Sequence, residues 1–508
     1  MAFNLAVIGD IHLNVNSPSP QHACLEWAVK KLSESSVDLL VVVGDITGQG
    51  MPNAASFFAD RLKTINIPKL VVMGNTDIRS PEHFPTIKRL LETESILPCN
   101  GFLAIGLNTE RAVIQPHERV MMNDVSASQQ VLLFLHHDLD SLETESRKWI
   151  ECWMASHSVS LMVSGHTHRD SQRYIGNADV RTIRGLDPDK ASGGPPAISY
   201  FNFDGQSWEK TEDTFLAGTV CDWNKHDKEE FIGRLGISCF DPVSGIDFAV
   251  KNTIRFIELR PEAVSLSLKE PLRRWREMGQ TCLSVHLPEL LWNKTMKKVD
   301  GVSVCEATIK WAMTLGAQMF TIHVPNVAVG LMEEGSAAWR EFSDAYFTLF
   351  NTVSNCVEIH IENMHMTSSE SNDDHRRFGY LPDECLRWIR EVNTRIGVDC
   401  ASLLLDIGHA RNNAPFSESY PLSAWYTTTG QSIGALHVHQ VVQSKDGLLN
   451  HQSFDEVYGS LISLSGLIWS WKYGLIRHAP MFLEIRDVQK SYQSFQKLRN
   501  YINTDSYE

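Results

Sequence analysis

The stretch VVMGNTDI, residues 71–78, is a short apolar run that ends at a glycine and continues with an amide, a hydroxyl and a carboxylate. Such runs, rich in β-branched residues, are typical of buried strands in a parallel sheet, which present polar residues at their carboxyl ends. The same pattern recurs in NLAVIGD, LLVVVGD, FLAIGLN, VLLFLHH and SLMVSGH. It predicts an α/β domain at residues 1–210, with AISYFNFDGQSW at 197–208 as an antiparallel edge hairpin.

The second half of the chain repeats the strand pattern in a longer series. Helical segments such as LPDECLRWIREVNTRIG, residues 381–397, lie between most of the strand candidates. Eight strand–helix units in roughly 270 residues are typical of a (β/α)8 barrel, which we predict for residues 234–508. The charged stretch at 211–233 lacks clear periodicity and is expected to be a linker. The strand candidates are 235–240, 254–259, 281–286, 317–323, 357–363, 401–409, 433–439 and 481–486.

Length and composition favour a cytoplasmic protein of two domains. A chain of 508 residues is too long for one ordinary core. The ten cysteines include no CxxC pair, which is typical of thiols in a reducing compartment. The N-terminal MAFNLAVIGDIH has no basic region and is interrupted by Asp10, so it is expected to be a strand and not a signal peptide. The apolar window LISLSGLIWSWKYGLI contains serines and Lys472, so we expect a buried helix and no membrane association.

Polar side chains gather at the predicted strand ends of the first domain. One aspartate after a strand is usually a helix N-cap, and one histidine is usually a hydrogen-bonded surface or core residue. Because the carboxyl ends of parallel strands converge, all of these side chains are expected in one crevice, where their repulsion and desolvation would be costly without cations. They are Asp10 and His12 in GDIH, Asp45 in GDITGQG, Asn75 in GNTD, His136 in LHHD, and His166 and His168 in GHTH.

These blocks resemble, in type and order, those of the calcineurin-like metallophosphoesterases. The resemblance implies an αββα sandwich with two divalent metals, which are Mn, Fe or Zn given the mixed carboxylate and imidazole ligands. Two such cations about 3.5 to 4 Å apart clamp a phosphoryl group and activate a water for in-line attack. The family pattern assigns Asp10, His12 and His168 to one metal, Asn75, His136 and His166 to the other, and Asp45 to a bridge between them.

Thr76 departs from the family pattern, which usually has a histidine there to protonate the leaving oxygen or stabilise the transition state. A threonine hydroxyl does not act as an acid near neutral pH. We therefore expect a phosphodiesterase that retains its metals and either favours good leaving groups or takes an acid from elsewhere, with His137 as the candidate. Asp77 is expected to orient a neighbour or cap the following turn. The alternative is a degenerate fold used as a scaffold, as in the retromer subunit of this family.

Seven of the eight barrel strand candidates also end in residues that can bind metals. In a barrel of this type such strand ends face one mouth, where the chemistry occurs. The residues are Glu258, His286, His323, Glu362, Asp406 followed by His409, His437 with His439, and Glu484.

This second pattern resembles the xylose-isomerase-like barrels, the superfamily of sugar epimerases and endonuclease IV. The resemblance implies one to three divalent metals, Zn, Mn or Mg. The third-metal motif, a DxH after the seventh strand, is not matched, because Asp446 and His451 have a different spacing. The resemblance assigns Glu362, Asp406, His437 and Glu484 to the common metal, His409 to a substrate or metal contact, and His286 and His323 to a further zinc.

Two chemistries follow for the barrel. With one divalent metal it isomerises a sugar by moving a proton, and with two or three zinc ions it hydrolyses a phosphodiester at an abasic site. The second chemistry requires a basic surface that faces DNA. The dense basic cluster RRWR at 273–276 lies in a helical context that is typical of a solvated outer face.

The sequence therefore predicts a metal-dependent phosphodiesterase whose barrel acts on the same or a related phosphorylated sugar or nucleotide. The alternatives are a repair-type nuclease that uses both metal sites and a non-catalytic, metal-stabilised scaffold. The balance of 46 basic and 61 acidic residues disfavours nucleic acid and favours a small phosphorylated substrate. The motifs do not specify an oligomeric state.

Overall fold

The structure, a computed structural model, describes residues 2–15, 17–91, 94–260, 267–365, 376–412, 420–445, 447–459 and 461–504. The chain divides into two compact units: Met1–Thr219 with Tyr458–Trp469, and Val220–Val457 with Ser470–Glu508. The segment Tyr458–Trp469 thus belongs to the first unit, although it follows most of the barrel in sequence. Residues 211–233, expected as a linker, contain the end of β11, the short helix η2 (Leu216–Gly218) and all but the last residue of α6 (Lys225–Arg234).

The first unit contains two β-sheets. One has the strand order β11 (Trp208–Thr214), β10 (Ala197–Phe203), β1 (Phe3–Ile8), β2 (Leu39–Val43) and β3 (Lys69–Val72). Strands β1, β2 and β3 are parallel, and β10 and β11 form the predicted antiparallel hairpin. The other sheet has the order β4 (Ile96–Cys99), β5 (Phe102–Leu107), β6 (Val131–Leu135), β7 (Val159–Ser164), β9 (Ala178–Thr182) and β8 (Ser171–Ile175).

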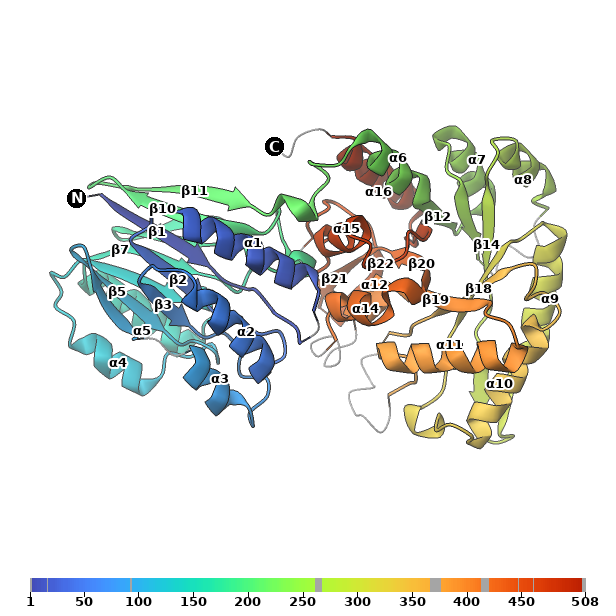
Figure 1. Cartoon of the computed structure of the whole chain (residues 1–508), viewed down its shortest axis with the longest axis horizontal. Helices are drawn as coiled ribbons and strands as arrows, with labels where there is room; N and C mark the ends of the chain where they lie inside the picture. The colour runs from blue at the N-terminus through green and yellow to red at the C-terminus, as the bar shows by residue number, and fades with distance from the viewer. Residues whose placement is uncertain are drawn as a thin grey trace. The chain divides into compact units, whose positions relative to one another are not determined.

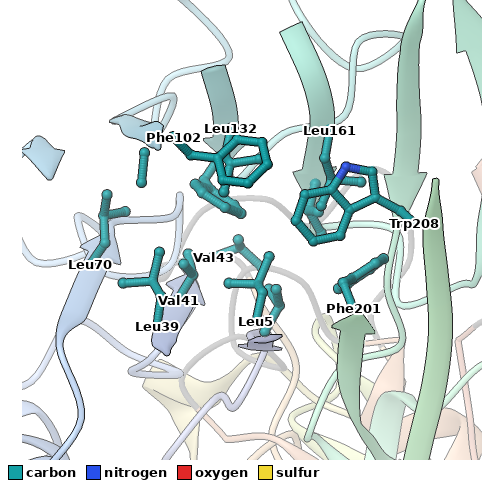
Figure 2. Close-up of a cluster of buried hydrophobic side chains, with 14 of the residues drawn as sticks. Leu5, Leu39, Val41, Val43, Leu70, Phe102, Leu132, Leu161, Phe201 and Trp208 are labelled. Carbon is teal, nitrogen blue, oxygen red and sulfur yellow. The ribbon is translucent and has the colours of Figure 1, made fainter. Parts of the chain in front are cut away.

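A shared hydrophobic core joins the two sheets. Figure 2 shows Leu5, Val41 and Leu70 of the first sheet in one cluster with Phe102 and Leu132 of the second. Strands β2 and β6 are buried along their whole length, which explains their continuous apolar sequences. The unit is therefore held together by the runs that the sequence identified as strands.

Helices cover the sheets of the first unit. A second cluster packs β5, β6 and β7 against side chains of α4 and α5, such as Met122, Ile150 and Trp153. Figure 1 shows α1, α2 and α3 along the strands β1, β2 and β3. The helices are α1 (Pro20–Glu34), α2 (Pro52–Lys63), α3 (Phe84–Leu91), α4 (Pro116–Asn123), α5 (Thr144–Ser156) and the short η1 (Pro188–Lys190).

The second unit is a closed barrel of eight parallel strands, as predicted. All eight strands lie within the predicted ranges. They are β12 (Leu235–Cys239), β13 (Phe256–Leu259), β14 (Cys282–His286), β17 (Met319–His323), β18 (Glu358–Glu362), β19 (Ala401–Asp406), β20 (Ile433–Val438) and β23 (Met481–Leu483).

Helices alternate with the barrel strands, and α7 to α11 are visible around them in Figure 1. Two hairpins are added, β15 (Leu291–Asn293) with β16 (Lys298–Asp300) and β21 (Gln440–Ser444) with β22 (Gly447–Gln452). The helices are α7 (Pro242–Asn252), α8 (Lys269–Arg276), α9 (Val302–Thr314), η4 (Val329–Leu331), α10 (Ala337–Phe350), α11 (Pro382–Ile396), α12 (Ile407–Arg411), α14 (Leu422–Thr429), η5 (Gly430–Ser432) and α16 (Val488–Asn503).

Two predictions about environment can be compared with the structure. All ten cysteines are free thiols, so no disulfide framework forms. The apolar window near the C-terminus contains the short helix α15 (Ser465–Lys472). Among the described residues, no helix has both the length and the apolar composition that a membrane span requires.

Candidate metal centres

The first centre is built on the loops that follow β1, β2, β3, β6 and β7. The N–H of His12 donates to the carbonyl of Asp45 at 2.9 Å, which joins the loops after β1 and β2. Gly74 allows the loop after β3 to approach, because a Cβ at this position would lie 2.2 Å from Oδ1 of Asp45. The strand ends thus deliver their polar residues to one place, as the sequence predicted.

Five of the predicted ligands have a left-handed backbone conformation. Non-glycine residues adopt it rarely, and such strain is concentrated at functional sites. The φ angle is 49° at Asp10, His12 and Asp45, 69° at His166 and 54° at His168.

Asp45 lies between two groups of ligand atoms. On one side its Oδ2 is 3.5 Å from Nε2 of His12, and that nitrogen is 3.3 Å from Nε2 of His168. Asp10 completes this group with Oδ1 at 3.8 Å from Nε2 of His168. On the other side Oδ1 of Asp45 is 3.4 Å from Nε2 of His136.

His136 lies in the middle of the second group. Its Nε2 is 3.0 Å from Oδ1 of Asn75 and 3.3 Å from Nδ1 of His166. Its Nδ1 is 2.9 Å from the carbonyl oxygen of Val43. This contact fixes the proton on Nδ1 and leaves the Nε2 lone pair for a metal.

The geometry and the electrostatics of this centre fit bound cations. For metal–nitrogen distances of about 2.0–2.1 Å, two nitrogens at a tetrahedral angle lie about 3.3 Å apart. The pairs His12–His168 and His136–His166 both have this separation, 3.3 Å. Burial raises the pKa of Asp10 to about 7 despite the opposing charge of His136, and the Asp45 carboxylate adds to the rise. A divalent cation would offset this cost.

Asp77 orients its neighbours, as predicted. Its buried carboxylate accepts hydrogen bonds from the N–H and Oγ1 of Thr47 at 2.8 and 3.1 Å. It also accepts from the N–H of Gly74 at 2.9 Å and that of Ile46 at 3.3 Å. Asp77 therefore ties the loop that carries Asn75 to the loop that carries Asp45.

Thr76 and His137 are the two positions that the sequence connected with leaving-group assistance. Thr76 is buried, and its N–H donates to Oδ1 of Asp45 at 2.8 Å, so its backbone helps to position the carboxylate of Asp45. The ring of His137 has its centroid 4.3 Å from that of His166, and its ligand atom groups with those of His136 and His166. Burial, followed by the charges of His136 and His166, lowers the pKa of His137 to about 3, which does not favour it as a proton donor.

Among the described residues, at least three groups of potential ligand atoms lie at the barrel mouth, and the atoms within each group lie within 4.8 Å of one another. The first group is Glu362, Asp406, His437 and Glu484; the second is His286, His323 and Glu362; the third is Asp406, His409, His439 and His451. Glu362 is thus shared by the first and second groups, and Asp406 by the first and third.

His437 is central to the first group. Its Nδ1 lies 2.9 Å from Oε2 of Glu484, 3.3 Å from Oε1 of Glu362 and 3.7 Å from Oδ2 of Asp406. In the second group, Oε2 of Glu362 is 3.0 Å from Nε2 of His286 and 3.4 Å from Nε2 of His323. All ligands assigned by the resemblance are therefore brought together.

Glu258 is not a member of these three groups and lies behind His437. Its Oε2 is 2.9 Å from Nε2 of His437, and its carboxylate accepts hydrogen bonds from the hydroxyls of Ser238, Ser284 and Thr321 at 3.0, 3.2 and 2.7 Å. Burial alone would raise the pKa of Glu258, but the charge and hydrogen bond of His437 lower it to about 2. The carboxylate thus keeps the proton of His437 on Nε2 and leaves Nδ1 for a metal.

The third group includes two residues, His439 and His451, that the sequence analysis did not assign to a metal. Nε2 of His439 is 3.0 Å from Oδ1 of Asp406, and the N–H of His451 donates to Nδ1 of His439 at 2.9 Å. His451 also has a left-handed backbone, with φ at 58°. Nε2 of His409 and Nδ1 of His451 are buried and have no hydrogen-bond partner among the described residues, which fits a cation between them.

One feature of the sequence indicated that His439 could belong to the metal site. In LHVH the two histidines are separated by one residue, so the alternation of a strand directs both to the same face, here the barrel interior. For His451 the sequence offered only an unmatched motif with the wrong spacing, because this residue reaches the group from the β21–β22 hairpin. Asp446, the other half of the expected motif, lies outside the described residues.

Arginines of the basic cluster at 273–276 form ion pairs within their own unit. Arg273 pairs with Glu270 at 2.7 Å, and Arg274 pairs with Asp247 at 2.7 Å. Trp275 is buried. The cluster is thus part of the outer face of α8, as the sequence favoured, and two of its charges are matched by carboxylates.

Comparison with known proteins gives one family match, which lies in the first unit. The sequence profile of the calcineurin-like phosphoesterases matches residues 3–170. No curated protein matches the chain.

Several solved structures are similar to parts of the chain. A D-tagatose 3-epimerase-like protein is 16% identical, with a TM-score of 0.40 over 54% of this chain and 98% of its own. Purple acid phosphatase PPD1 from yellow lupin (Lupinus luteus) seeds is 11% identical, with a TM-score of 0.34 over 42% of this chain and 54% of its own. A predicted phosphoesterase from Streptococcus pneumoniae TIGR4 is 11% identical, with a TM-score of 0.27 over 42% and 90%. Residues 3–170 therefore form a calcineurin-like phosphoesterase domain, and the same chain continues into an eight-stranded parallel β/α barrel.

Proposed function

We propose that the first unit is a phosphodiesterase that uses two divalent cations, Mn, Fe or Zn. The observation that carries this proposal is the position of Asp45, whose two carboxylate oxygens face separate ligand groups at 3.5 and 3.4 Å. When bound, two such cations clamp a phosphoryl group and provide a nucleophile at neutral pH.

The residues of the chain have distinct roles in this proposal. Asp10, His12 and His168 bind one cation, and Asn75, His136 and His166 bind the other. Asp77 and the backbone N–H of Thr76 hold the bridging carboxylate of Asp45 in place. Because Thr76 has no acidic side chain, substrates with good leaving groups are favoured.

The test is turnover of bis(p-nitrophenyl) phosphate by the full chain with added Mn²⁺. The substitution Asp45→Asn preserves size but removes the bridging charge, and we expect a loss of at least about 100-fold in kcat/KM. Asp60→Asn, an exposed aspartate on α2, is the matched control and should retain activity. Absence of turnover with every metal tried would contradict the proposal and favour the scaffold alternative.

For the barrel, we propose a metal-dependent site that acts on the same or a related phosphorylated sugar or nucleotide. The three ligand groups adjoin one another, because Glu362 links the first to the second and Asp406 links the first to the third. This arrangement supports hydrolysis of a phosphoester over isomerisation, since proton transfer needs one cation whereas clamping of a phosphoryl group uses two or more. Asp406→Asn should abolish hydrolysis of the phosphoester at the barrel site and lower the metal content of the full chain. A single barrel cation would instead favour the isomerase.

The repair-type nuclease shares this barrel chemistry but differs in substrate. The pairing of Arg273 and Arg274 with carboxylates makes a small phosphorylated substrate the favoured partner. Binding of duplex DNA that weakens steeply with salt would support the nuclease, whereas no binding at low salt would exclude it.

A further inference from the structure

Arg260 is a cationic residue at the mouth of the barrel, where the ligand groups of the second unit lie. It directly follows β13 and comes two residues after Glu258, so the alternation of a strand directs both side chains to the same face. Its guanidinium lies over the ring of Phe240, with Cζ 5.2 Å from the ring centroid, and 17% of its side chain is exposed. Arg260 is therefore held beside the metal ligands and does not extend into solvent.

Arg260 contacts one carboxylate oxygen of Glu484 and leaves the other to the ligand group. Nη1 of Arg260 donates to Oε1 of Glu484 at 2.8 Å. Oε2 of Glu484 is buried, has no hydrogen-bond partner among the described residues and lies 2.9 Å from Nδ1 of His437. The two oxygens of this carboxylate thus have different surroundings, a guanidinium on one side and an imidazole on the other.

The contact between Glu484 and His437 fits a cation that binds both residues. Glu258 accepts the proton on Nε2 of His437, so Nδ1 of His437 offers a lone pair, as Oε2 of Glu484 does. Two acceptors 2.9 Å apart repel each other unless a cation lies at both. This indicates that Oε2 is the metal-binding oxygen of Glu484 and that Oε1 is the oxygen held by Arg260.

The positive charge of Arg260 does not by itself favour a cation at this position. Nη1 of Arg260 also lies 3.8 Å from Oε2 of Glu258, so the guanidinium borders two carboxylates of the barrel mouth. Because like charges repel, a purely electrostatic role would make Arg260 oppose metal binding. A guanidinium is planar and always charged, which suits it to fix the orientation of a carboxylate.

We propose that Arg260 is a positioning residue that turns Oε2 of Glu484 toward His437 and the barrel cation. This inference rests on the proposed metal-dependent site of the barrel. By holding Oε1, Arg260 prevents both oxygens of Glu484 from binding the same cation and keeps this residue a single-oxygen ligand.

The experiment measures the Zn²⁺ affinity of the full chain by competition with a chromophoric chelator. The class of bound metal that Glu484→Gln weakens identifies the first barrel group. We expect Arg260→Met to weaken the same class by about 10- to 100-fold, the range for residues that orient metal ligands. Arg260→Lys should recover part of the loss, because an ammonium keeps the charge and a donor but not the planar fork. Arg390→Met, an exposed arginine on α11, removes the same charge and should leave all metal affinities unchanged.

The direction of the change separates positioning from charge alone. Tighter or unchanged binding of this class in Arg260→Met would refute the positioning role, because loss of a positive charge alone strengthens the binding of a cation. If Arg260→Met does not fold, Arg260→Gln also removes the charge and takes its place, with the same expected direction. Failure of Glu484→Gln to weaken any class of bound metal would instead refute the proposed metal-dependent site of the barrel.

Discussion

Replacement of Glu258 by glutamine tests whether this buried carboxylate prepares His437 for metal binding. The carboxylate has a pKa of about 2 and is ionised at neutral pH, where it accepts the Nε2 proton of His437 at 2.9 Å. Glutamine keeps one acceptor for the surrounding hydroxyls, but its NH2 group must face either those hydroxyls or the imidazole donor. The tautomer with a free Nδ1 is then no longer enforced.

The expected magnitude follows from similar contacts behind metal ligands, whose loss lowers metal affinity by about 10- to 100-fold. This corresponds to about 1.4 to 2.7 kcal/mol. The assay is competition with a chromophoric chelator on the full chain, which resolves tightly and weakly bound metal. We expect one class of barrel metal to weaken in Glu258→Gln, while the metals of the first centre remain unchanged.

Glu334→Gln provides the matched control, since Glu334 is exposed between η4 and α10 and the substitution removes the same charge. It should leave all metal affinities unchanged. If Glu258→Gln folds normally and binds metal as tightly as the parent, Glu258 does not orient His437 and the description of the first barrel group is wrong.

Three further predictions concern the first unit and the metals in general. Asp77→Ala leaves four buried donors without an acceptor and should lower the free energy of unfolding by about 3 to 5 kcal/mol in urea denaturation. A loss below about 1 kcal/mol would contradict the role of Asp77 in joining the two loops. Gly185→Ala places a Cβ 2.7 Å from Cβ of Asp10 and should reduce the metal content of the first centre by one equivalent, whereas full metal content would show that the backbone at Gly185 shifts without cost. Removal of metals by EDTA should lower the melting temperature and re-addition should restore it, because cations that bind only the native state stabilise it by about 2.7 kcal/mol at 100 times Kd; an unchanged melting temperature would count against bound cations.

The sequence was sufficient for both folds because the signals are local. A strand such as β2 is buried along its length, so each of its residues is apolar and the run is unambiguous. The ligands at strand ends follow from the topology, since parallel strands converge at their carboxyl ends. Thr76 and Asp77 could be interpreted for the same reason, because their loop directly follows β3.

The features that sequence reasoning missed depend on distant segments. His451 joins Asp406 through a hairpin whose register is not encoded in any strand-end motif. Lys190 reaches His12 from 178 residues away in sequence, at the end of a segment that follows the family blocks. The segment Tyr458–Trp469 packs with the first unit although it is embedded in the barrel sequence. Such contacts follow from tertiary packing, which local patterns do not specify.

The most direct test of the account is anomalous X-ray scattering from crystals of the Mn-loaded full chain. The account predicts two peaks about 3.5 to 4 Å apart, one on each side of the Asp45 carboxylate, with His12 beside one peak and His136 beside the other. A single peak, or two peaks of which neither contacts Asp45, would contradict the two-cation centre on which the proposed phosphodiesterase depends.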